Sequence, residues 1–273
     1  MKIAVSGKGG VGKSTIAAAL ALTLARRGEK VLAFDADPDA NLAAALGVPP
    51  DMAPAPISRQ IALIEERTGV KIDSYGQVFK MNPEVSDVAE RFALNWRGVD
   101  VLTLGAVRKG GGGCACPASA FAKALVTDLV LFKKQTLIMD MEAGVEHLGR
   151  GTAHGVDVMI VAVEPGQRSI DCAATIERMC GEIGIKRLVF AVNKVASRSD
   201  GDYAAAALSA ALAPNASPAV SDGSGITSHL SVEIPYIESL RSADRPGVSV
   251  MDAAGAVFTE KIEELLTLLY SED

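Results

Sequence analysis

The stretch that decides the fold is Gly7-Lys8-Gly9-Gly10-Val11-Gly12-Lys13-Ser14-Thr15, near the start of the chain. It contains the G-x-x-x-x-G-K-[ST] spacing of a phosphate-binding loop. A short apolar run, Ile3–Val5, precedes the stretch, and an Ala- and Leu-rich segment follows it. Strand, glycine loop and helix in this order form the context in which the motif binds phosphate, so the sequence predicts a nucleotide-binding protein.

The residue types of this loop suit polyphosphate chemistry. Glycines let backbone N–H groups turn towards phosphate oxygens, and the positive end of the following helix favours the same anion. We expect Lys13 to reach the β- and γ-phosphates of ATP and the Ser14 hydroxyl to bind Mg²⁺. The residues expected to line the nucleotide are Gly9, Gly10, Val11, Gly12, Lys13, Ser14 and Thr15.

Composition limits the remaining function classes. The chain has 273 residues, 49% of them hydrophobic, and we expect one P-loop ATPase domain over residues 1–273. The net charge of −6 comes without a basic patch, which argues against nucleic-acid binding, and no apolar run reaches the length of a membrane span. Met1-Lys2-Ile3 leads directly into a strand, so we expect no signal peptide and a cytoplasmic protein.

Apolar runs alternate with helical segments along the whole chain. This alternation predicts an α/β fold with a doubly wound, mostly parallel sheet and helices on both faces. The expected strands are 3–5, 30–34, 78–81, 99–104, 136–140, 157–163, 186–192 and 232–236. The expected helices are 16–25, 42–46, 57–67, 118–131, 169–181, 202–212 and 251–269, and residues 214–228 have the composition of a surface insertion.

A carboxylate ends the strand 136–140 and opens the string Asp140-Met141-Glu142-Ala143-Gly144. This string has the spacing D-x-x-x-G, one residue longer than the D-x-x-G form of a nucleotide-sensing loop, and we expect it to play that part. We expect Asp140 to hold Mg²⁺ through water and the Gly144 N–H to contact the γ-phosphate. The loop should rearrange when that phosphate leaves, as in other nucleotide-driven switches.

The cysteines fall into two groups. Cys114 and Cys116 follow four consecutive glycines and precede Pro117, at the start of an expected helix whose dipole favours thiolates. Two such pairs in a symmetric dimer supply four sulfurs, which suits Zn²⁺, Ni²⁺ or an iron–sulfur cluster. A redox pair and a pair of small buried residues are the alternatives. Cys172 and Cys180 lie in an amphipathic helix and are expected to be core residues.

The string G-K-G-G-V-G-K-S-T resembles the deviant phosphate loop of the dimerising ATPases that include MinD, ParA and the nitrogenase iron protein, in the SIMIBI class of P-loop NTPases. The resemblance implies that Lys8 reaches the nucleotide of a partner subunit and that Asp37 positions the attacking water. It also places Asn193 at the adenine edge and Pro235 near the base. The residues expected to act in catalysis are Lys8, Lys13, Asp37 and Asp140.

Three further strings narrow the resemblance: D-A-D-P-D-A-N-L, the glycine-led C-A-C-P, and D-M-E-A-G-V-E-H-L-G-R-G-T. With them the chain resembles, over nearly its full length, the CooC-type ATPases that mature nickel-containing carbon monoxide dehydrogenase. The resemblance implies a homodimer that binds ATP or ADP with Mg²⁺, and Ni²⁺ or Zn²⁺ between the Cys114 and Cys116 pairs of two subunits. ATP would control dimerisation, and the dehydrogenase would receive the nickel.

Three alternatives stay open at this stage. The chain could serve another nickel enzyme, such as acetyl-CoA synthase. It could use the same thiolates as an iron–sulfur cluster carrier or reductase ATPase. A positioning protein of the partition type would bind DNA or membrane, but it would leave the cysteine pair unexplained and would need a basic surface that the composition does not show.

Overall fold

The computed structural model describes residues 1–72, 78–107, 116–132, 134–142, 144–145, 148, 150–185, 187–212 and 229–271. Within them one sheet of eight strands has the order β3-β4-β2-β5-β1-β6-β7-β8. The strands are β1 (Lys2–Gly7), β2 (Val31–Asp35), β3 (Leu94–Trp96), β4 (Val99–Thr103), β5 (Thr136–Asp140), β6 (Val158–Val163), β7 (Leu188–Val195) and β8 (His229–Pro235). All neighbours are parallel except β3 and β4, which confirms the predicted doubly wound, mostly parallel sheet.

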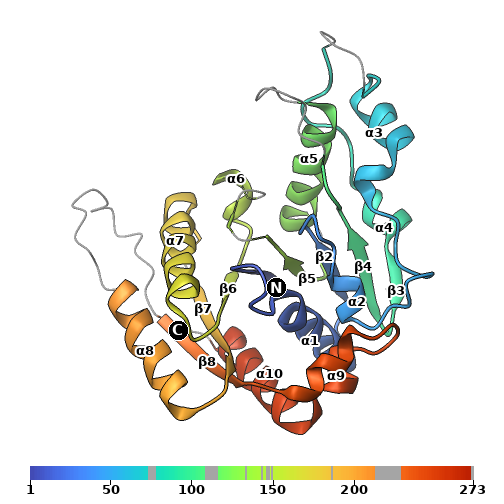
Figure 1. Cartoon of the computed structure of the whole chain (residues 1–273). Coiled ribbons are helices and arrows are strands. Elements are labelled where there is room, and N and C mark those ends of the chain that lie inside the picture. The colour runs from blue at the N-terminus through green and yellow to red at the C-terminus, as the bar shows by residue number, and fades with distance from the viewer. Residues whose placement is uncertain are drawn as a thin grey trace.

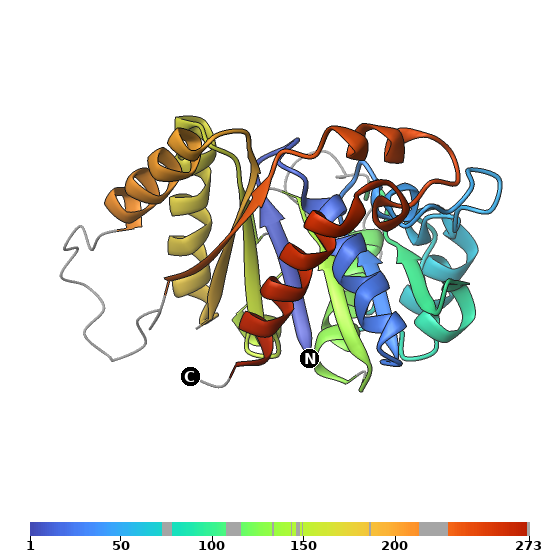
Figure 2. The ribbon, with the colours of Figure 1, turned by 90° about the horizontal axis from the view of Figure 1, so that it is seen from below.

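Helices cover both faces of this sheet (Figures 1 and 2). One face carries α1 (Lys13–Arg26), α2 (Leu42–Ala45), α9 (Val250–Ala253) and α10 (Gly255–Tyr270). The other carries α3 (Ile61–Thr68), α4 (Val88–Phe92), α5 (Pro117–Leu131), α6 (Arg150–Ala153), α7 (Gln167–Ile183) and α8 (Arg198–Leu212). Two 3-10 helices, η1 (Ile57–Arg59) and η2 (Glu238–Asp244), lie in connections. Among the described residues, no helix combines the length and the apolar character needed to cross a membrane.

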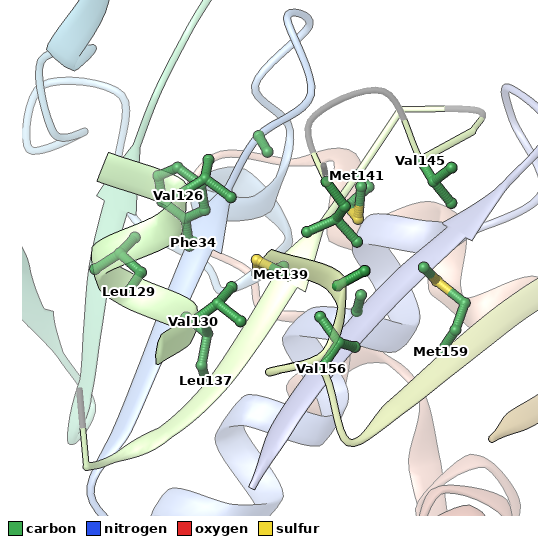
Figure 3. Close-up of a cluster of buried hydrophobic side chains, with 14 of the residues drawn as sticks. Phe34, Val126, Leu129, Val130, Leu137, Met139, Met141, Val145, Val156 and Met159 are labelled. Atoms are coloured by element: carbon green, nitrogen blue, oxygen red, sulfur yellow. The ribbon is translucent and has the colours of Figure 1, made fainter. Parts of the chain in front are cut away.

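The strands separate two hydrophobic cores because successive side chains point to opposite faces. On β2, Leu32 and Phe34 belong to the core under α5, whereas Val31 and Ala33 belong to the core under α1. Figure 3 shows part of the first core, in which Phe34 of β2 and residues of β5 lie against the apolar face of α5. Burial on both faces explains why these strands are continuous apolar runs.

Three expectations about the elements need correction, and a fourth cannot be compared. The single helix expected over 57–67 is a short 3-10 helix, η1, followed by the separate helix α3, with Gln60 between them. Residues 78–81 form no strand, and the sheet edge is instead made by β3, a strand of three residues that was not predicted. The single helix expected over 251–269 is two helices that are interrupted at Ala254, because Gly255, the first residue of α10, has a positive φ of 74°. The expected insertion 214–228 lies outside the described residues.

The topology brings one edge of the sheet into position for binding. In the sheet, β1 lies between β5 and β6. The chain runs from β1 through α1 to β2, on the β5 side of β1, and later crosses from β5 to β6, on the opposite side of β1. The register pairs Asp35 of β2 with Asp140 of β5, and Gly7 of β1 with Ala162 of β6. The carboxyl end of β1 therefore lies at the point where the winding reverses, which is where doubly wound sheets bind ligands.

Candidate active site

The phosphate loop connects β1 to α1 with a backbone that only glycine fits well. Gly12 caps the start of α1 in the left-handed region, at φ 99°. A Cβ atom on Gly12 would stand 2.4 Å from Asn193 Nδ2, and one on Gly7 would stand 2.3 Å from the carbonyl oxygen of Ala162. Glycine is thus required at both positions for two reasons: a Cβ atom would clash with these neighbouring atoms, and the positive φ angles disfavour other residues.

The carboxyl end of β7 supports this loop from the side. Asn193 is buried, and its Nδ2 donates a hydrogen bond to the Val11 carbonyl over 2.8 Å. Lys194 Nζ donates to the Gly10 carbonyl over 2.5 Å and lies 3.5 Å from a carboxylate oxygen of Glu164. The Nδ2 atom of Asn193 therefore stabilises the phosphate loop through this hydrogen bond. The expected contact of the Asn193 side chain with adenine stays a prediction.

Asp37 lies on the other side of the loop, directly opposite Lys13. Its Oδ2 is 3.5 Å from the Lys13 Nζ, and both side chains are largely shielded from solvent. Its Oδ1 accepts a hydrogen bond from the Asp39 N–H over 3.0 Å, which fixes the carboxylate in a tight turn. The lysine and the carboxylate expected to act in hydrolysis are thus brought together by the fold.

Asp35 was not singled out from the sequence, yet it shapes the loop that carries Asp37. It is fully buried, and its two carboxylate oxygens accept hydrogen bonds from the backbone N–H groups of Asp37 (3.1 Å) and Leu42 (2.9 Å). Burial, helped by the charge of Asp140, raises the pKa of Asp35 to about 7. The D-x-D spacing at a strand end was the available signal for this residue.

Asp140 is the candidate magnesium carboxylate at the end of β5. It is fully buried, and neither carboxylate oxygen has a hydrogen-bond partner of ordinary geometry among the described residues. Burial raises its pKa to about 6, although the nearby Ser14 hydroxyl and the Lys13 charge act in the opposite direction. Unsatisfied carboxylate oxygens close to a serine hydroxyl form a donor set that suits Mg²⁺, so these residues fit the expected ion.

Ser6 connects β1 to the predicted sensing loop. Its Oγ accepts a hydrogen bond from the Gly144 N–H over 3.1 Å and lies 2.9 Å from the carbonyl oxygens of both Glu142 and Gly144. The side chain is fully buried. Because a hydroxyl has one hydrogen, it donates to one of these carbonyls at a time. No motif in the sequence indicates this contact, since it depends on how β5 leaves the sheet beside β1.

The outer residues of the expected site lie at the rim. Lys8 is half-buried and lines a surface hollow together with Glu164, Gln167 and Arg168. Pro235 ends β8 and pairs with Val195 of β7, which follows Asn193 by two residues. The hollow beside Lys8 thus includes Glu164, whose carboxylate lies 3.5 Å from the Nζ of Lys194, the neighbour of Asn193.

Only one member of the expected metal-binding pair can be placed. Cys116 caps the start of α5, where its sulfur accepts the Ser119 N–H over 3.4 Å and lies 3.0 Å from the Ser119 hydroxyl. Cys114 lies outside the described residues. Within the part of the chain that the structure describes, no three His, Cys, Asp or Glu residues gather as a metal site. Cys180 is fully buried and Cys172 half-buried against the same core, as expected.

Comparisons with known proteins agree with this geometry. Residues 2–243 match the CobQ/CobB/MinD/ParA nucleotide binding domain. The chain is 40% identical, over 94% of its length and 91% of the relative's, to the carbon monoxide dehydrogenase accessory protein CooC of Rhodospirillum rubrum. It is 42% identical to an uncharacterized ATP-binding protein of Methanocaldococcus jannaschii, over 71% of this chain and 75% of that protein. The MinD cell division protein of Aquifex aeolicus matches with a TM-score of 0.65 at 19% identity, over 99% of this chain and 98% of that chain.

The phosphate loop at the winding reversal, the Lys13–Asp37 pair and the buried Asp140 define a P-loop ATPase. The likeness to MinD supports the fold alone, because its sequence identity is low. The chain belongs to the CobQ/CobB/MinD/ParA nucleotide-binding family, and within it to the branch that contains the CooC accessory protein.

Proposed function

We propose that this chain is an ATP-driven metallochaperone that assists nickel insertion into carbon monoxide dehydrogenase. The observation that carries the proposal is the 40% identity to the R. rubrum accessory protein over nearly the full length of both chains. The whole of residues 1–273 would act as one ATPase domain. We place its work in the cytoplasm, where ATP is available and cysteines stay reduced.

In hydrolysis, the phosphate loop and the carboxylates of Asp37 and Asp140 have separate roles. The loop N–H groups and Lys13 hold the phosphates of ATP, and Asp37 orients a water for attack on the γ-phosphorus. The water–phosphorus bond forms as the bond to the ADP oxygen breaks, and the proton of the water passes through the Asp37 carboxylate to the phosphate, which gives ADP and phosphate. Ser14 and Asp140 would hold Mg²⁺, which would supply positive charge against the phosphate oxygens.

A second copy of the chain would complete the site. Lys8 lies at the rim of the loop, half-exposed, where it can extend to the nucleotide of a partner subunit. A lysine supplied in this way would oppose the charge that grows during phosphoryl transfer. ATP would therefore favour the dimer, and the Gly144 N–H would report the presence of the γ-phosphate.

The metal site is proposed at the same dimer interface. Cys114 and Cys116 of each subunit would supply four thiolates to one Ni²⁺ or Zn²⁺, a number that suits tetrahedral binding. The position of Cys116 at a helix start supports this, because the helix dipole stabilises a thiolate there. ATP can drive metal release only if the metal binds one dimer state better than the other.

The test is anaerobic metal binding by the reduced protein. Ni²⁺ and Zn²⁺ are titrated with and without nucleotide while light scattering follows the mass. We expect one metal for two chains, lost in the Cys114→Ser/Cys116→Ser variant and retained in Cys172→Ser, a half-buried thiol outside the pair. Nickel-dependent activation of nickel-free dehydrogenase should be lost with the same double variant.

Three results would count against the proposal. Metal binding that survives the double substitution would remove the shared cysteine site. Stoichiometric iron and sulfide in the isolated protein would favour the iron–sulfur carrier instead. Intact metal binding without any effect on the dehydrogenase would point to a different nickel enzyme as the client.

A further inference from the structure

Ser6 is a buried hydroxyl to which the chemistry described above gives no role. It lies in β1, immediately before the phosphate loop, and contacts the segment that follows β5 through the Gly144 N–H and the carbonyls of Glu142 and Gly144. We infer that Ser6 is a specificity-determining residue that acts through Gly144 and sets how strongly the site prefers ATP to ADP. This inference rests on the proposed contact between Gly144 and the γ-phosphate.

The reasoning begins with the single hydrogen of the Gly144 N–H. In the structure that hydrogen is donated to Ser6 Oγ over 3.1 Å, away from solvent. A γ-phosphate oxygen that takes the same N–H must displace the serine oxygen. ADP has no γ-phosphate and binds without this displacement. The serine therefore opposes ATP binding and leaves ADP binding unchanged.

The position of Ser6 along β1 places its hydroxyl just beyond the backbone pairing of β1 with β5. The Met141 N–H donates to the Val5 carbonyl over 2.9 Å, which continues the backbone pairing of β5 with β1. After Met141, the Ser6 hydroxyl, and not the β1 backbone, forms the hydrogen bonds to Glu142 and Gly144. A side chain at this boundary can fix the loop in one position while leaving the strands themselves undisturbed.

The experiment compares nucleotide affinities of the full-length protein in the presence of Mg²⁺. Dissociation constants for ADP and for the non-hydrolysable ATP analogue AMPPNP are measured for wild type, Ser6→Ala and Ser6→Thr. We expect Ser6→Ala to bind AMPPNP about three- to tenfold more tightly, the factor that corresponds to the net contribution of one hydrogen bond. Its ADP affinity should stay at the wild-type value. Ser6→Thr keeps the hydroxyl and should keep the wild-type ratio of the two constants.

Thr23→Val is the matched control. Thr23 is a buried residue of α1, and its Oγ1 has no hydrogen-bond partner within the described residues. Removal of this hydroxyl should therefore leave the ratio of the ADP and AMPPNP dissociation constants unchanged. An unchanged ratio in Ser6→Ala, or an equal change in Thr23→Val, would overturn the inference. Ser6→Cys, which keeps the side-chain volume, serves the same comparison if the alanine variant does not fold. Failure of the wild type to bind or hydrolyse ATP would overturn the proposed function itself, so the two failures can be told apart.

Discussion

At the scale of single residues, Asp37 is the group on which hydrolysis should depend most. Its carboxylate faces Lys13 at 3.5 Å and is fixed by the Asp39 N–H, so it is positioned before any water arrives. We expect Asp37→Asn to lower the kcat of ATP hydrolysis by about 100-fold or more, because an amide cannot accept the proton of the attacking water. Phosphate release under saturating ATP measures this loss.

Asp39→Asn is the control for that variant. Asp39 is exposed, and it contacts Asp37 through its backbone N–H, which the substitution retains. Its kcat should stay close to the wild-type value, and both variants should retain ADP binding. A kcat for Asp37→Asn within about twofold of wild type would remove Asp37 from the mechanism.

The neighbouring carboxyls Asp35 and Asp140 make a prediction about pH. Their folded-state pKa values, about 7 and about 6, lie above the ordinary value of 3.8 because both groups are buried. Between about pH 4 and 7 the folded protein therefore holds protons that the unfolded chain has released, so its stability falls as the pH rises. Without Mg²⁺ or nucleotide, Tm should fall by several degrees from about pH 5.5 to 7.5.

Asp35→Asn tests the origin of this slope. Asparagine cannot ionise, so the variant should show a flatter dependence of Tm on pH, whatever its absolute stability. A slope equal to that of wild type would assign the pH dependence to other groups. Added Mg²⁺ should raise Tm mainly at the higher pH values, where Asp140 is ionised.

At the scale of elements, the glycines of the phosphate loop form a graded series for substitution by alanine. Gly9 has open space and no positive φ, Gly10 has open space at φ 82°, and Gly12 has both φ 99° and the close contact with Asn193. Gly9→Ala should leave Tm nearly unchanged. Gly10→Ala should cost about 1 kcal/mol of folding free energy, and Gly12→Ala about 2–3 kcal/mol.

Thermal or denaturant unfolding of the three variants measures this order. Gly10→Ala should lose more folding free energy than Gly9→Ala because of backbone strain. Gly12→Ala should lose more than Gly10→Ala because of the additional steric clash. Equal losses for Gly10→Ala and Gly12→Ala would mean that Asn193 moves away without cost, and the brace that β7 gives the loop would then be weak.

The sequence predicted the long buried elements well and the short ones poorly. The expected strands 99–104, 136–140 and 157–163 agree with β4, β5 and β6 to within one residue, because continuous apolar runs mark strands buried on both faces. β3 was missed because its hairpin turns at Arg97 and Gly98, both with positive φ, and arginine is not a residue that signals such a turn. The helix break at Gly255 was missed because a lone glycine is tolerated inside a helical pattern.

The residues of the candidate site also differ in how well the sequence predicts them. Residues that belong to a contiguous motif, such as Lys13 and Asp140, could be proposed for the candidate site from spacing alone. Ser6 could not, because its partners lie about 140 positions away and are reached only through the register of β1 with β5. Short-range patterns contain no information about such contacts.

At the scale of the whole molecule, the position of Lys8 predicts a dimer that depends on this lysine. Light scattering with ATP and Mg²⁺ should show dimers for wild type and monomers for Lys8→Ala, and ATP hydrolysis should fall with the loss of the dimer. Binding of ADP by the monomer should stay intact, since Lys13 and the loop N–H groups remain. Lys13→Ala is the comparison, because it should lose nucleotide binding itself. Full dimerisation and hydrolysis by Lys8→Ala would exclude a role across the interface.

The burial of Asp35 and Asp140 side by side also affects how nucleotide binding must be measured. Near pH 6 to 7 these carboxyls retain part of their protons, and an ion that loads onto Asp140 will expel them into solution. The heat recorded by a calorimeter then includes the ionisation heat of the buffer. We expect titrations in PIPES and in Tris, neither of which is a phosphate, to give different apparent enthalpies for magnesium–nucleotide binding but equal affinities. The difference, divided by the difference in buffer ionisation heat, gives the number of protons released.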